Sequence, residues 1–66
     1  MVTLQNDART FQLVFTPAGP DRVQVQEFSR VGVTWKERET IVVSAERAYA
    51  LKSFALQNNF SITSKP

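Results

Sequence analysis

The sequence contains no cysteine and no histidine, and it has only two glycines among its 66 residues. Without cysteine there is no disulfide, and the usual ligand sets for zinc, haem and iron–sulfur clusters are excluded. Without histidine the chain also lacks the most common general base. The two glycines are too few for a glycine-rich phosphate loop. We therefore expect no metal and no cofactor.

Long apolar runs are also absent. The longest uninterrupted run of aliphatic residues covers residues 41–43, whereas a membrane-spanning helix needs about 20 apolar residues. The first ten residues have neither the charged start nor the apolar stretch of a signal peptide. We therefore predict one soluble domain over residues 1–66, located in the cytoplasm, or in the nucleus of a eukaryote.

The sequence offers no constellation of catalytic groups. Its six acidic residues are scattered, and the closest pair, Glu37 and Glu39, lies in a charged stretch. Ser44 has no nearby base that would make it a nucleophile. We therefore predict that the chain is not an enzyme. The formal net charge of +2 permits nucleic-acid binding but does not by itself indicate it.

Alternation of apolar and polar residues predicts a β-sheet in the first two thirds of the chain. Residues 10–16 alternate, with Phe11, Leu13 and Phe15 on one side, and the turn-forming residues 17–21 end this strand. Alternation resumes at Arg22, and a bend is expected near residues 29–32 because an unbroken strand to residue 36 would be about 50 Å long. Residues 37–39 read as a charged connection, and residues 40–43 as a short β-branched strand. Residues 1–8 are expected to form a flexible arm.

A helix is predicted from Ala45 to about Asn58. Ser44 supplies the N-cap hydroxyl, and the run that follows contains no glycine, proline or β-branched residue. Residues 60–63 read as a short strand or a packed tail. The predicted fold class is α+β, with an antiparallel sheet of about four strands followed by one C-terminal helix.

The predicted helix carries two apolar stripes. Ala48, Leu51, Phe54 and Ala55 form the first stripe, which we expect to face the sheet. The second stripe, which lies beyond Lys52, consists of Ala45, Tyr49 and Leu56. Either this second stripe packs against another copy in a homodimer, or Tyr49 is half-exposed and the Lys52 side chain lies over it.

The even-numbered side of the second predicted strand combines guanidinium groups, amides and one aromatic ring. Such a surface holds phosphates and stacks a base, although a polar outer face is also typical of any half-buried sheet. The candidate contacts on this side are Arg22, Gln24, Gln26, Phe28 and Arg30. Lys36 and Arg38 beyond the bend extend the set, together with Trp35, which is either a core residue or a stacking platform.

Two sequence blocks resemble the positive cofactor four family of transcriptional coactivators and their bacterial and phage relatives. The first block, residues 23–28, is similar to the family's V-x-[IV]-R-E-[YF] signature, with Gln26 in place of arginine. The second block, residues 41–52, is similar to I-S-L-x-x-E-x-W-x-x-L-K and matches it without a gap, with Ala48 in place of tryptophan. The loop between them carries acidic residues where the family has lysine and glycine.

This resemblance implies a four-stranded antiparallel sheet followed by a helix, a homodimer formed through the helices, and binding of single-stranded DNA on the sheet. The leading hypothesis is therefore a homodimeric, sequence-tolerant module that binds single-stranded nucleic acid in transcription or DNA metabolism. The alternative is a small protein-binding module or inhibitor, of the kind phages encode, that uses the sheet face or an edge strand.

Overall fold

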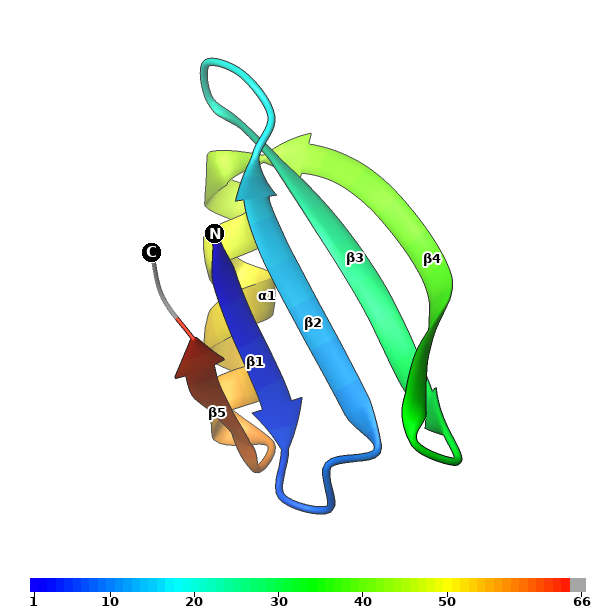
Figure 1. Cartoon of the computed structure of the whole chain (residues 1–66). Helices are drawn as coiled ribbons and strands as arrows, with labels where there is room; N and C mark the ends of the chain where they lie inside the picture. Colours follow the sequence, from blue (N-terminus) through cyan, green and yellow to red (C-terminus); the bar gives the residue numbers. More distant parts are fainter. Residues whose placement is uncertain (65–66) are drawn as a thin grey trace.

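The computed structural model describes residues 1–64, which form one antiparallel sheet covered on one face by a helix (Figure 1). The strands are β1 (Val2–Asn6), β2 (Phe11–Pro17), β3 (Arg22–Val31), β4 (Thr34–Ser44) and β5 (Phe60–Ser64), and the helix is α1 (Ala45–Gln57). Their order in the sheet is β4-β3-β2-β1-β5. The predicted α+β class with a helix after the sheet is confirmed. A fifth strand follows the helix and returns to pair with β1.

The prediction that residues 1–8 form a flexible arm is wrong. Val2–Asn6 form β1, which lies between β2 and β5 in the sheet. Leu4 is 0% exposed and is the largest fully buried side chain of the described chain. The physical reason is the alternation at the start of the sequence, because Val2 and Leu4 face the helix opposite Phe15 and Leu13.

Asn6 fixes the connection from β1 to β2. Its Oδ1 accepts hydrogen bonds from the backbone nitrogens of Thr10, at 2.8 Å, and Phe11, at 3.0 Å. Its Nδ2 donates to the Thr10 hydroxyl at 2.8 Å. An asparagine side chain that replaces backbone partners in this way is a common device of tight turns.

Strands β3 and β4 form a long hairpin that turns at residues 32–33. Gly32 has φ 63°, a conformation that glycine adopts without steric cost, and the predicted bend lies at this turn. The predicted charged connection at residues 37–39 is wrong, because these residues lie inside β4. A register shift opposite residues 27–28 makes Arg38 the extra residue of a β-bulge, so pairing continues along the whole hairpin.

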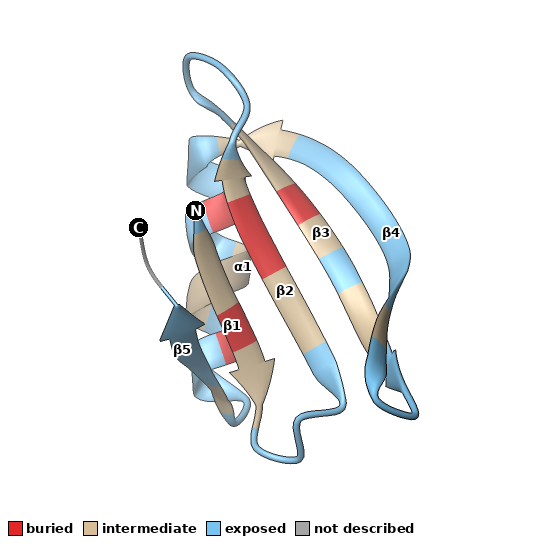
Figure 2. Cartoon of the chain, viewed as in Figure 1, coloured by how far each residue is buried: buried red, intermediate tan, exposed pale blue. Residues whose placement is uncertain are grey.

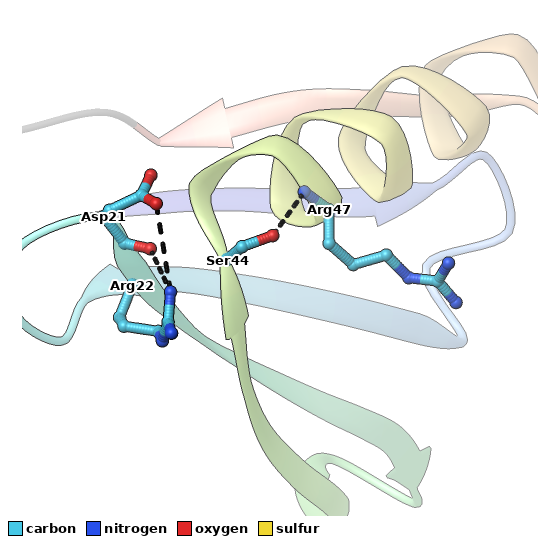
Figure 3. A network of polar contacts seen from close by, with 4 residues as sticks. All are labelled: Asp21, Arg22, Ser44 and Arg47. Carbon is cyan, nitrogen blue, oxygen red and sulfur yellow. Dashed lines mark hydrogen bonds and ion pairs between the residues drawn. The ribbon is translucent and has the colours of Figure 1, made fainter.

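Helix α1 begins and ends where the sequence predicts. The Ser44 Oγ accepts a hydrogen bond from the Arg47 backbone nitrogen at 3.1 Å, as an N-cap does (Figure 3). At the other end Asn58 is the C-cap, and Asn59 adopts a left-handed conformation with φ 68°. Within residues 1–64, no helix combines the length and apolar character needed to cross a membrane.

The core lies between the sheet and α1 and is small (Figure 2). It contains five buried residues: Leu4, Phe15, Val25, Ala48 and Ala55. Ala48 and Ala55 bring the helix close to the sheet. The prediction that Phe54 faces the sheet is wrong, since its side chain is 66% exposed. Phe54 is about 100° around the helix from Ala55 and therefore lies at the margin of the contact.

Candidate nucleic-acid interface

The sheet face that points away from α1, called the outer face below, carries the even-numbered side chains of β3. Residues directly opposite each other in paired strands share a face, so the register identifies their neighbours. Phe28 lies between Gln12 of β2 and Glu37 of β4. Gln26 lies between Val14 and Thr40 of the same two strands, and Gln24 lies between Thr16 and Val42. The sequence assigned Gln24, Gln26, Phe28 and Arg30 to this face, and the structure places them together on it.

Phe28, Arg30 and Trp35 form a cluster at the turn end of the outer face. Trp35 pairs directly with Arg30, and the Arg30 guanidinium carbon lies 5.8 Å from the centroid of the Trp35 ring. Arg30 Nε also donates to the Gly32 carbonyl at 3.1 Å, which holds the guanidinium in place. Of the two roles open for Trp35, the structure therefore selects the outer face over the core. Two aromatic rings and a cation thus lie on neighbouring rows of one surface.

Glutamine side chains occupy the middle of the outer face. Gln5 Nε2 donates to Gln12 Oε1 at 2.7 Å, and Gln24 and Gln26 follow on β3. Val14 lies among them and is only 8% exposed although the helix is on the other side. Its directly paired neighbours on this face are Thr3 and Gln26, and the polar ends of the surrounding amides form a surface that donates and accepts hydrogen bonds.

Three arginines, Arg9, Arg22 and Arg30, lie on the outer face or at its ends. Arg22 lies at the junction of β3, β4 and α1, where its Nη1 donates to the Asp21 carbonyl at 3.0 Å (Figure 3). Arg9 donates from the β1–β2 turn to the Gln5 side chain. Glu37, the acidic residue on this face, accepts hydrogen bonds from Gln26 at 3.3 Å and from Thr40 at 2.7 Å. Arg22 also forms an ion pair with the Asp21 carboxylate at 3.9 Å, and the other side-chain donors of this surface are arginines and amides.

Lys36 and Arg38 do not belong to this surface. Lys36 pairs with Ser29 on the helix side of the sheet, and Arg38 Nη1 donates to the Ser29 Oγ at 3.4 Å. The prediction that they extend the outer-face contacts is therefore corrected. The two-residue turn at residues 32–33 is the cause, because it aligns Lys36 with Ser29 and so reverses the odd–even alternation, which the β-bulge at Arg38 restores only from Glu39 onward.

The sequence-based prediction also omitted two residues of this surface, Gln5 and Arg9. Both lie in or next to the segment that was expected to be an arm. The signal that identifies Gln5 is the alternation of Val2, Thr3 and Leu4, which predicts a strand with Gln5 on the polar side.

The predicted dimer stripe of Ala45, Tyr49 and Leu56 is exposed on α1. Lys52 Nζ lies 5.7 Å from the centroid of the Tyr49 ring. This contact fits the alternative reading, in which the Lys52 side chain covers part of an exposed Tyr49.

Comparisons with known proteins identify no family for this chain. No protein-family model matches it, and neither the curated proteins nor the solved structures include a significant match.

Proposed function

We propose that the chain binds single-stranded nucleic acid along the outer face. The observation that carries the proposal is the cluster of Phe28, Arg30 and Trp35, where two aromatic rings share one face with a guanidinium group. Aromatic rings stack on bases of any sequence, and arginine binds the phosphates between them. The sequence-based resemblance to the positive cofactor four family predicts the same ligand on the same face.

The amides around this cluster support a sequence-tolerant mode. Gln12, Gln24 and Gln26 both donate and accept hydrogen bonds, so they bind sugars, phosphates or base edges without requiring one base. An unpaired strand exposes its bases to such a surface, whereas a duplex hides them in its stack. We therefore propose single strands over duplexes, and DNA as the ligand that the resemblance favours.

A fluorescence titration tests the proposal directly. Trp35 is the only tryptophan of the chain, so the intrinsic emission reports on the cluster itself. We expect oligothymidylate to quench the emission in a saturable manner, because a stacked base contacts the ring. A duplex of equal length serves as the control and should bind more weakly. Unchanged emission and no retention of the oligonucleotide would favour the alternative, a module that binds proteins.

The salt dependence of binding should be modest. The outer face and its ends present three arginines, Arg9, Arg22 and Arg30. With about 0.7 counterions released per phosphate contact on a single strand, three contacts give a log–log slope of about −2. Repeating the titration at several salt concentrations measures this slope. A slope near zero would contradict phosphate contacts by these arginines.

A further inference from the structure

An apolar groove opens on the opposite side of the sheet, beside the second half of α1. The cavity has a volume of about 360 Å³. Phe11 and Ile41 on the sheet and Phe54 on the helix line it, and they are 46%, 41% and 66% exposed. The groove exists because β4 extends about 36 Å, whereas α1 is about 20 Å long and covers only part of the sheet (Figure 1).

Two carboxylates lie in the wall of this groove. Glu27 and Glu39 are directly opposite each other on β3 and β4, a cross-strand arrangement in which like charges repel. Neither carboxylate has an ion pair or a side-chain hydrogen bond within residues 1–64. A ligand that fits the groove therefore combines an apolar surface with positive charge.

The β3–β4 hairpin itself carries apolar surface and positive charge, at positions closer to its turn than Glu27 and Glu39. Lys36 and Arg38 lie on the helix side of the sheet, beside Ser29. Val33 at the turn is 88% exposed and supplies apolar surface. Along one face of the hairpin, an acidic pair is thus followed by a basic pair.

We infer that the occupant of the groove is the hairpin of a second copy of this chain. The two-fold axis passes between the acidic pair and the basic pair on this face of the hairpin. It places Lys36 and Arg38 of each copy against Glu27 and Glu39 of the other. Such a contact is self-complementary and closed, as a two-fold interface requires. The exposed Phe11, Ile41 and Phe54 supply the apolar area, and the four charge contacts set the register.

This interface differs from the helix stripe that the sequence predicts. It uses the Phe54 side of α1, whereas Ala45 and Tyr49 of the stripe lie on the other flank, where they line the smaller cavity near Val2 and Val23. It also gives Lys36 and Arg38 a role on the face where the structure places them. The inference goes beyond nucleic-acid binding and does not rest on it.

A charge-exchange experiment tests the pairing. One variant carries Glu27→Lys and Glu39→Lys, and the other carries Lys36→Glu and Arg38→Glu. Each variant alone should self-associate at least tenfold more weakly than the wild type in sedimentation equilibrium, since like charges then meet across the interface. An equimolar mixture should recover the mass of two chains, because each contact again joins opposite charges.

Folding and the alternative interface are controlled separately. The Glu27→Lys, Glu39→Lys variant places four cations on neighbouring rows of one face, so circular dichroism and the melting temperature are measured first to establish that each variant is folded. Leu56→Lys should leave the dimer intact. A wild type that is monomeric at high micromolar concentration overturns the inference, as does a dimer that only Leu56→Lys dissociates. Folded variants that stay monomeric when mixed overturn it too. Oligonucleotide quenching of Trp35 is scored independently, so the two proposals fail separately.

Discussion

Replacing Leu4 with alanine is expected to destabilise the fold by about 2–5 kcal/mol, the range for truncating a buried leucine. Leu4 is the most buried side chain of the described residues and joins Phe15, Val25, Ala48 and Ala55 in the core. In a 66-residue chain such a loss is a large fraction of the total stability. Chemical denaturation followed by circular dichroism measures the change.

Leu56→Ala is the matched control, because it removes the same atoms from a leucine that is 42% exposed on the helix. We expect the control to change the free energy of unfolding far less than Leu4→Ala, since an exposed side chain leaves no cavity. Equal and small effects of both substitutions would mean that residues 2–6 contribute nothing to the fold. That result would restore the expectation of an N-terminal arm.

Local signals sufficed to predict the helix, strands β2 and β3, and the last part of β4 at residues 40–43. Ser44 before an uninterrupted helix-forming run defines the start of α1, and the paired asparagines 58–59 mark its end. Likewise the alternation of Leu13 and Phe15 defines the helix-facing side of β2. These features depend on residues a few positions apart, so the sequence displays them directly.

Features that depend on pairing between distant residues were not predictable in the same way. Strand β1 is only five residues long, and its neighbour β5 comes from the end of the chain. No residue near Leu4 in the sequence indicates that β1 pairs with β5. The bulge at Arg38 is likewise a property of the β3–β4 pairing, since it appears only when the strands are aligned.

The turn and the bulge of this hairpin together decide which predicted site residues lie on one face. If side chains alternated without interruption from residue 31 to residue 35, Trp35 would lie on the same apolar side as Val31 and Val33. The turn at residues 32–33 instead aligns Trp35 with Arg30, so the ring lies on the polar outer face. The bulge then returns Glu39 and Ile41 to the helix side. The site is therefore half predictable: the β3 side of the surface follows from alternation, and the β4 side does not.

Phe28 provides the most discriminating test of the outer face. Its side chain is half-buried between Gln12 and Glu37 on the face that α1 does not cover. Stacking of a base on an aromatic ring contributes about 1–3 kcal/mol when the ring is truncated. Phe28→Ala should therefore weaken oligonucleotide binding by about five- to a hundredfold, measured by fluorescence anisotropy of a labelled oligothymidylate.

The matched control is Phe15→Ala, on the neighbouring strand but facing the helix. Phe15 is buried in the core, so its truncation should cost about 3–5 kcal/mol of stability. Phe28→Ala should cost much less, because only part of its surface leaves water on folding. If Phe28→Ala unfolds the domain as Phe15→Ala does, the ring supports the fold and the outer face loses its stacking residue. If Phe28→Ala leaves both stability and oligonucleotide affinity unchanged, the amide surface serves another ligand, and the protein-binding alternative becomes the better account of this face.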